Sequence, residues 1–381
     1  MTSDFLQLFD ALIRLPSVSS ANPQLDMGNR AVIELLAERF SALGFNCEIL
    51  PLATHPQKAN LIATLGQGAG GLVLSGHTDT VPFDAGLWNS DPLRLTERDN
   101  RLYGLGSTDM KGFFAIVHEA VQGLDAAKLR QPLVILATAD EESSMDGARA
   151  LVQAQRQLGR KAVIGEPTGL RPINRHKGVM MERLRVQGQS GHSSNPALGR
   201  SALEAIHEMI GALMIFRARL QRDFRDPHFA IDIPTMNFGA IHGGDNPNRI
   251  CGHCELEFDV RLLPGMGSDT LRDDIRGLLE PIARRHQVEF EFLPLFPGIE
   301  PFANDHSELV ALCEKLTGNS AQSVAFGTEA PFLQELGLDT VVLGPGSIDV
   351  AHQPNEYMAL DQIQPCIDLL RKLITRYCLM A

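Results

Sequence analysis

Short, almost uninterrupted apolar segments that alternate with helical patterns constrain the fold of this chain most strongly. Three of these segments are GLVLSGH (71–77), PLVILATAD (132–140) and KAVIGE (161–166), and a helical pattern covers MKGFFAIVHEAVQGL (110–124). Strands that are apolar on both faces are typical of a mostly parallel sheet with helices on both sides. The pattern therefore predicts an α/β domain.

From about Met180 the order of elements changes. We expect a strand at 179–189, a helix at 202–220, strands at 235–242 and 249–262, a helix at 270–285 and a strand at 287–293. This is the order of a ferredoxin-like α+β unit. The α/β pattern resumes after Pro294. We therefore expect a domain made of residues 1–179 and 294–381, interrupted by an inserted domain of residues 180–293.

Composition argues against several classes of protein. The formal net charge of −12 and the pI near 5.5 argue against DNA or RNA as a partner, because phosphate binding needs a basic surface. The N-terminal segment has the spaced apolar positions of an amphipathic helix rather than the regions of a signal peptide. No stretch approaches the ~20 apolar residues of a membrane span. We expect a cytoplasmic protein whose partners are neither nucleic acids nor membranes.

The six cysteines are scattered and predict no disulfide framework. Cys251 and Cys254 have the spacing of a thiol-redox pair, but the surrounding RICGHCELEFDVRL predicts a strand, whereas redox pairs lie at a helix N-terminus. A structural zinc site would need a second ligand pair, and none is evident. A redox protein is an alternative interpretation, and its activity would survive chelators and be lost on alkylation.

Acidic and histidine residues recur where the predicted strands end. They are His77, Asp79, Glu141, Glu142, Glu166 and His352, and Asp109 stands just before the helix at 110–124. In open α/β sheets the active site lies at the carboxyl ends of the strands, so we expect these side chains on one edge. Imidazoles and carboxylates without thiolates suit hydrolytic zinc, cobalt or manganese, and they suffice for two ions ~3.5–4 Å apart. One acid must remain off the metal to transfer protons.

Five short runs form a motif set: SGHTDTVPF, YGLGSTDMKGF, TADEES, GEPT and SGHSS. Longer strings extend the set nearly end to end: ATADEESSMDGARA, GEPTGLRPINRHKG, HGGDNPNRIC, GTEAPF and LGPGSIDVAHQPNEY. In these motifs the chain resembles the di-zinc aminoacylase/carboxypeptidase family of metallohydrolases. The resemblance implies a zinc-peptidase-like catalytic domain, and an inserted lid domain through which two subunits form a homodimer.

The resemblance also implies roles for the residues at the strand ends. Ligands of two Zn²⁺ ions per subunit, for which Co²⁺ is able to substitute, would be His77, Asp109, Glu142, Glu166 and His352, with Asp109 bridging the ions. Glu141 would be the base that activates water and later protonates the leaving amine, and Asp79 the acid that orients His77. The sequence leaves open an exchange of roles between the neighbours Glu141 and Glu142.

Residues in and beside the inserted domain are implied to bind substrate. Arg261 would bind the α-carboxylate, for which arginine has bidentate geometry, unless it is a solvated or ion-paired strand residue. Lys177 would assist it or pair at the surface. Asn248 would act from the same side, although a turn role is an alternative. His192, ahead of a helix expected to begin near Ala197, would donate to the carbonyl oxygen in the active site of the partner subunit.

Gly327, Thr328 and Glu329 replace a Gly-Thr-Ser-Asp run of related desuccinylases. We hypothesise that Glu329 pairs with a free ammonium on the substrate side chain, because an ammonium that leaves water needs an opposite charge. A buried structural carboxylate is the alternative interpretation.

The function implied by the resemblance is metal-dependent hydrolysis of the amide bond of N2-acetyl-L-ornithine to L-ornithine and acetate, a step of arginine biosynthesis. The small-molecule substrate would thus be an N-acyl amino acid. Alternatives within the family are a broad aminoacylase, a succinyl-diaminopimelate desuccinylase and a dipeptidase. A binding protein on a decayed fold is a further alternative, but the filled acidic and imidazole positions argue against it.

Overall fold

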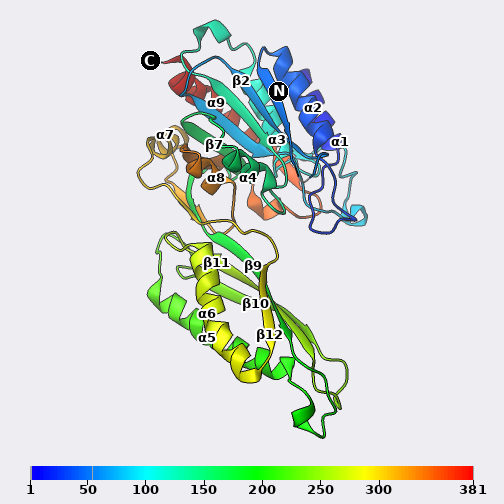
Figure 1. Ribbon diagram of the computed structural model, residues 1–381. Helices are drawn as coiled ribbons and strands as arrows, with labels where there is room; N and C mark the ends of the chain where they lie inside the picture. Colours follow the sequence, from blue (N-terminus) through cyan, green and yellow to red (C-terminus); the bar gives the residue numbers. More distant parts are fainter. Residues whose placement is uncertain (1, 54, 381) are drawn as a thin grey trace. The chain divides into compact units, whose positions relative to one another are not determined.

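The computed structural model of the chain describes residues 2–53 and 55–380, which divide into two compact units (Figure 1). The first unit comprises Met1–Asn174, Asn304–Gln322 and Thr328–Ala381. The second unit comprises Arg175–Ala303 and Ser323–Gly327, and is therefore inserted into the chain of the first.

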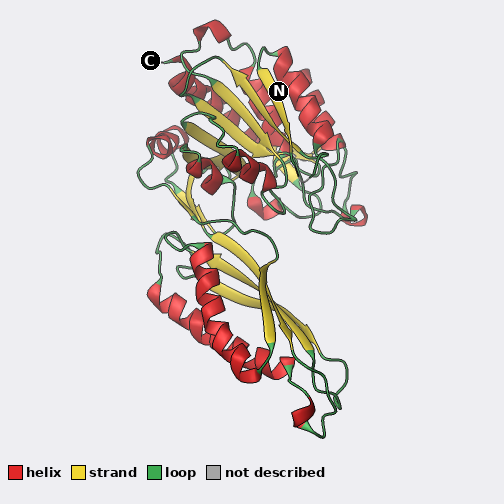
Figure 2. Cartoon of the chain, viewed as in Figure 1, coloured by secondary structure: helices red, strands yellow, loops and turns green. Residues whose placement is uncertain are grey.

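A mixed sheet forms the centre of the first unit (Figure 2). Its main strands are β1 (Asn46–Pro51), β2 (Ala59–Leu65), β3 (Leu72–His77), β6 (Leu133–Thr138), β7 (Lys161–Pro167) and β15 (Asp339–Gly344). They lie in the order β1-β2-β6-β3-β7-β15, in which β6, β3, β7 and β15 run parallel and β1 and β2 pair antiparallel. The predicted α/β fold with a mostly parallel sheet is confirmed.

Helices cover both faces of this sheet (Figure 2). One layer consists of α1 (Ser3–Arg14), α2 (Arg30–Ala42), α3 (Lys111–Val121), α7 (Glu308–Thr317) and α9 (Leu360–Ile374), all of which contribute to one apolar core. The opposite layer contains α4 (Asp146–Gln153) and α8 (Ala330–Glu335). Burial of the sheet on both faces explains why β3 and β6, which are buried along their whole length, are mostly apolar.

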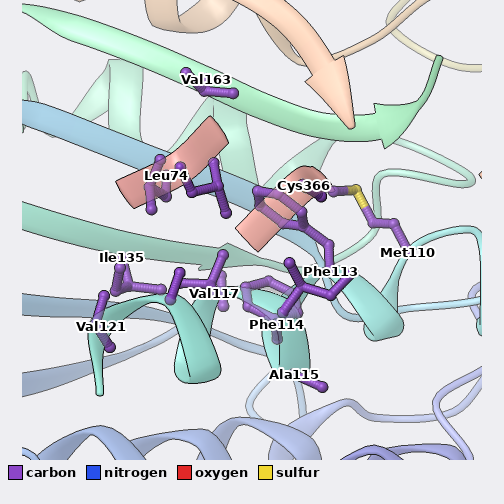
Figure 3. Packing of buried hydrophobic residues seen from close by; sticks show 14 of the residues in the cluster. Leu74, Met110, Phe113, Phe114, Ala115, Val117, Val121, Ile135, Val163 and Cys366 are labelled. Carbon is purple, nitrogen blue, oxygen red and sulfur yellow. The ribbon is translucent and has the colours of Figure 1, made fainter. Parts of the chain in front are cut away.

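Helix α3 lies at the centre of the first core (Figure 3). Its Phe113, Phe114 and Val117 belong to the same cluster as Leu74 of β3 and Ile135 of β6. The helix is buried on almost every side, as expected for one in which apolar residues predominate. Its N-terminus is therefore held firmly beside the sheet, which fixes the position of the residue that precedes it by two, Asp109.

Several short strands remain, and some of them include residues of the second unit. Strands β16 (Tyr357–Ala359), β5 (Arg101–Tyr103) and β4 (Thr96–Arg98) form a separate three-stranded antiparallel sheet. Strand β8 (Ile173–His176) begins in the first unit, where Ile173 pairs with β15, and ends in the second, where His176 pairs with β13 (Phe302–Ala303). Strand β14 (Gln322–Val324) completes the set of short strands.

The second unit is an antiparallel sheet covered by two helices on one face (Figure 1). Its elements are β9 (Gly178–Gln187), α5 (Ala202–Asp223), β10 (Thr235–Gly243), β11 (His253–Leu262), α6 (Ser268–His286) and β12 (Glu289–Pro294). The strand order β10-β11-β9-β12 and the order of elements along the chain are ferredoxin-like, as predicted. Alternate residues of β11 are buried in the second core, which is separate from the first.

Two local predictions need correction. No helix begins at Ala197, because Pro196–Leu198 forms a short 3₁₀ turn and α5 starts at Ala202, where the Ser201 side chain accepts a hydrogen bond from the Glu204 N–H. Strand β11 starts at His253, so Cys251 precedes it, and all six cysteines are free. Among the helices in the described part of the chain, none combines the length and the apolar character that crossing a membrane requires.

Candidate active site

The strands of the first unit bring a set of imidazoles and carboxylates to one edge of the sheet. His77 is the last residue of β3, Glu166 lies near the end of β7, and Glu141 and Glu142 follow β6. Asp109 precedes α3, and His352 follows a 3₁₀ turn at Ile348–Val350. These six residues belong to the first unit.

The Asp109 carboxylate lies between two imidazoles. Asp109 Oδ1 is 3.0 Å from His77 Nε2, and Asp109 Oδ2 is 3.3 Å from His352 Nε2. Glu142 Oε1 is 2.9 Å from the same His352 nitrogen, and Glu166 Oε1 is 3.9 Å from His77 Nε2. His77, Asp109 and Glu142 each offer one ligand atom within 4.8 Å of the others. The set therefore converges on a space of the size of a metal site.

Burial and mutual repulsion perturb the carboxylates of this set. Burial raises the pKa of Glu142 and of Glu166, and the nearby Asp109 charge raises both further. Burial also acts to raise the pKa of Asp109, but its hydrogen bonds with His352 and His77 lower it below the ordinary range. The same contacts with Asp109 and Glu142 raise the pKa of His352 to about 10.

The donor set fits a hydrolytic metal centre. Glu166 Oε1 is buried without a hydrogen-bond partner, and the carboxylates repel one another at close range. A cation among them would supply the missing partner and relieve the repulsion. Nitrogen and oxygen donors without thiolates are the ligands that suit zinc, cobalt or manganese in hydrolases.

Asp79 supports this set through two contacts. Its backbone oxygen is 3.0 Å from His77 Nδ1, whereas its carboxylate oxygen Oδ1 is 3.8 Å from the same nitrogen. The other oxygen, Oδ2, accepts a hydrogen bond of 3.0 Å from the Glu142 N–H. The backbone carbonyl of Asp79, rather than the predicted carboxylate, is thus the nearer partner of the imidazole, and the carboxylate holds the Glu142 backbone.

Glu141 and Glu329 are acidic side chains of the same neighbourhood. The pKa of Glu141 is raised well above its ordinary value by burial, against an opposing effect of His77, and the charges of Glu166, Glu142 and Glu329 add to the rise. Glu329 is 1% exposed, and its Oε1 has no hydrogen-bond partner. Burial raises the pKa of Glu329 to about 7, although a hydrogen bond with Thr138 opposes the shift. Thr328 Oγ1 accepts from the Ala330 N–H at 3.1 Å.

The remaining predicted site residues belong to the second unit. Arg261 on β11 donates from Nε to Asp259 Oδ1 at 3.1 Å, and the buried Lys177 donates from Nζ to the Ile233 oxygen at 2.8 Å. Gly327 is the last residue of this unit.

His192 and Asn248 lie together on the exposed surface of the second unit. The backbone N–H of Ser193 donates to the Asn248 oxygen at 3.1 Å, and His192 pairs with Arg249. His192 Nδ1 accepts a hydrogen bond of 3.2 Å from the Ser194 N–H, which leaves Nε2 as the outer nitrogen of the ring.

Sequence reasoning missed two buried charges that hold the segments of the site. Lys58 Nζ lies 2.8 Å from Asp26 and 2.7 Å from Asp140, which immediately precedes Glu141. Glu356, which is 2% exposed, accepts three backbone hydrogen bonds from the loop that ends at Asp109. The one feature of the sequence that points to Glu356 is its position only four residues after His352. Nothing in the sequence around Lys58 indicates its partners.

A family model described as peptidase family M20/M25/M40 matches residues 73–376. A protein named acetylornithine deacetylase from Vibrio campbellii is 48% identical over 375 residues, with 98% of each chain covered. A protein of the same name from Pasteurella multocida is 49% identical over 375 residues, again with 98% of each chain covered.

Solved structures share the architecture at low identity. The M20 family metallo-carboxypeptidase Sso-CP2 from Sulfolobus solfataricus has a TM-score of 0.73 and 17% identity, with 98% of this chain and 99% of that one covered. The YXEP protein of Bacillus subtilis, described as a dinuclear metal binding peptidase from the M20 family, has a TM-score of 0.66 and 15% identity, with 97% and 96% covered. At such identities the likeness concerns the fold alone.

Proposed function

The chain belongs to peptidase family M20/M25/M40 and is a metal-dependent amidohydrolase, and we propose that it hydrolyses N2-acetyl-L-ornithine to L-ornithine and acetate. The observation that carries the proposal is the identity of almost half of all residues, over 98% of both chains, with proteins named acetylornithine deacetylase. The longer sequence strings predict the same substrate.

The metal centre of this activity is assigned to His77, Asp109, Glu142, Glu166 and His352. Their convergence on Asp109, which has an imidazole at each carboxylate oxygen, supports a pair of ions with Asp109 between them. We assign Zn²⁺ to the pair, with Co²⁺ as the substitute, on the basis of the nitrogen and oxygen donors. When bound, such ions act as Lewis acids that polarise the amide carbonyl.

Glu141 is assigned the proton transfers. It lies beside the metal-binding set, where the charges of His77, Glu166 and Glu142 act on it. Its carboxylate would take a proton from the attacking water as the oxygen bonds to the amide carbon. The same proton then goes to the nitrogen as the C–N bond breaks, so that acetate and the free amine leave.

The second unit would supply the groups that bind substrate. Arg261, assisted by Lys177, is assigned the α-carboxylate, because a guanidinium binds a carboxylate through two hydrogen bonds. Asn248 and His192, whose loops are joined by a hydrogen bond, would act together, with His192 donating to the carbonyl oxygen. Gly327 of this unit and Thr328 of the first unit are also assigned to substrate binding.

A homodimer is the proposed assembly, with His192 acting on the active site of the partner subunit. The second unit offers a surface for it: β10 is an edge strand, and Leu203, Met214 and Ile215 of α5 are 49%, 47% and 75% exposed. Unpaired strand edges and exposed apolar side chains are both features of surfaces that a second copy covers.

Glu329 is the proposed partner of the substrate ammonium. It is buried beside the metal-binding set and one of its oxygens lacks a hydrogen-bond partner. Replacing Glu329 by Gln should lower kcat/KM for acetylornithine much more than for N-acetylmethionine, which has no side-chain ammonium. An unchanged ratio of the two kcat/KM values would mean that Glu329 is a structural carboxylate.

A substrate panel tests the proposed function. Acetate release from acetylornithine is compared with the hydrolysis of N-acetylmethionine, N-succinyl-diaminopimelate and a dipeptide by the same metal-loaded protein. We expect the highest kcat/KM for acetylornithine. A higher kcat/KM for one of the other compounds would replace the proposal by an aminoacylase, a desuccinylase or a dipeptidase of the same family.

A further inference from the structure

Glu356 holds the loop that carries Asp109 through both of its carboxylate oxygens. Oε2 accepts a hydrogen bond from the Gly106 N–H at 2.9 Å. Oε1 accepts from the Thr108 N–H at 2.7 Å and from the Asp109 N–H at 3.0 Å. One fully buried side chain thus takes three donors from four consecutive residues.

The backbone around Glu356 reinforces this contact. Its carbonyl oxygen accepts from the Gly104 N–H at 3.1 Å, and the next residue, Tyr357, pairs with Tyr103 in the β16–β5 ladder. The loop from Gly104 to Asp109 is therefore fixed to the C-terminal segment from its beginning to its end. It is also tightly enclosed, since a Cβ on Gly106 would lie 2.8 Å from Thr80 Cγ2.

The buried Lys111 side chain lies against the same loop, beside Gly106. Lys111 is 1% exposed and donates from Nζ to the Leu15 oxygen at 2.6 Å. Glu356 and Lys111 interact electrostatically. Two buried side chains that lie outside the metal-binding set, Glu356 and Lys111, thus border the Asp109 loop.

The same C-terminal segment carries His352, four residues before Glu356. Asp109 lies 3.0 Å from His77 and 3.3 Å from His352 through its two oxygens, so a small displacement of its backbone would break one contact or the other. Glu356 therefore joins two segments, far apart in the sequence, that each carry an assigned metal ligand.

We infer that Glu356 is a positioning residue that sets metal affinity by holding Asp109 between His77 and His352. The inference rests on the metal centre of the proposed function. A carboxylate can accept all three backbone hydrogen bonds, whereas the amide of glutamine has one acceptor oxygen and turns an NH₂ group toward a backbone N–H. The orientation of metal ligands by surrounding hydrogen bonds commonly affects metal affinity by about 10–100-fold.

The test compares Glu356→Gln with a matched control, Asp339→Asn. Asp339 is a partly buried carboxylate at the opposite, amino-terminal end of β15, where it accepts hydrogen bonds from Lys161 at 2.6 Å and Asn304 at 2.8 Å. Zn²⁺ affinity is measured by competition with a chromophoric chelator, and the thermal unfolding of each metal-free variant is recorded in parallel.

We expect Glu356→Gln to bind Zn²⁺ about 10–100-fold more weakly than wild type, and Asp339→Asn to bind it within about twofold of wild type. Both variants should melt at a lower temperature than wild type when metal-free, so the melting temperature alone does not separate them. Excess metal should restore much of the activity lost in Glu356→Gln. Wild-type Zn²⁺ affinity in a folded Glu356→Gln protein would overturn the inference.

Glu356→Asp provides the second variant if Glu356→Gln does not fold. It keeps the charge but shortens the side chain by one methylene group, so the three donors are no longer all within reach, and the same weakening of Zn²⁺ binding is expected. Because the readout is metal binding, the inference and the proposed substrate fail separately. If the wild-type protein binds Zn²⁺ but does not hydrolyse acetylornithine, the proposed substrate is wrong. The proposed effect of Glu356 on Zn²⁺ affinity is still tested by the binding measurement.

Discussion

The charged side chains at the sheet edge of the first unit and those on β9 and β11 of the second unit lie in different environments. In the first unit, Asp109, Glu142 and Glu166 are buried at one sheet edge, where burial and mutual repulsion raise the pKa of the two glutamates. In the second unit, β9 and β11 carry pairs of opposite charge on a partly exposed face, such as Arg183 with Glu257 at 2.7 Å. The first arrangement costs stability without a cation, whereas the second is satisfied by the protein itself.

The difference indicates where the chemistry is located. A protein that buries several carboxylates together without enough cationic partners loses folding stability, unless a bound ion neutralises their charge. Exposed ion pairs contribute little stability and impose no such requirement. Substitutions in the two units should therefore have effects of different kind and size.

The largest effect on activity is expected in the first unit, for substitutions of the neighbours Glu141 and Glu142. Glu141→Ala should lower kcat by about 10²–10⁴-fold and leave metal binding nearly intact, because a general base is not itself a ligand. Glu142→Ala should instead reduce the number of metal ions bound per chain. Metal analysis and steady-state kinetics on both variants check this. If Glu141→Ala lost metal while Glu142→Ala kept it and lost activity, the two roles would be exchanged.

In the second unit, His192 is the residue that we expect to act directly in catalysis, and it is not a metal ligand. His192→Ala should lower kcat by about 10²–10³-fold, the usual cost of removing a donor to a developing oxyanion, at unchanged metal content. Mixing this variant with Glu141→Ala under subunit exchange tests the proposed action on the partner subunit. Random dimers should recover about a quarter of wild-type activity, since half are heterodimers with one intact site of two. No recovery, despite demonstrated exchange, would place His192 in the site of its own chain.

The last comparison concerns stability and sets one buried charge against one partly exposed charge. Lys58→Met leaves the buried Asp140 without its cation and should destabilise the protein by about 3–5 kcal/mol. Glu257→Gln removes the nearer of two acidic partners of Arg183, in a pair whose side chains are 34% and 33% exposed, and should change stability by less than about 1 kcal/mol. Denaturant unfolding of both variants gives the two values. Equal losses would contradict the contrast between the units.

The sequence predicted most of the long elements because their patterns are local. The mostly apolar strands β3 and β6 and the alternating strand β11 each have a pattern that follows from the environment of the strand itself. Strand ends also predicted that His77 and Glu142 would meet at one edge, and the structure brings both to Asp109.

The missed features depend on contacts between distant segments. Strands β5 and β16 have three residues each, too few for a periodic pattern, yet their pairing places Glu356 against the Asp109 loop. Lys58 and Asp140 are 82 positions apart, and the sequence around each of them does not predict that they form an ion pair. The predicted helix start near Ala197 was wrong because Pro196 begins a 3₁₀ turn and the capping residue is Ser201.

The central claim is that the carboxylates and imidazoles at the sheet edge of the first unit hold the metal on which amide hydrolysis depends. Its most direct test is a titration of chelated protein with Zn²⁺ or Co²⁺ during acetylornithine hydrolysis. We predict that acetate release is lost on chelation and returns as metal is added, reaching a plateau near two ions per chain. Acetylornithine hydrolysis at the wild-type rate by protein shown to be metal-free would contradict the account.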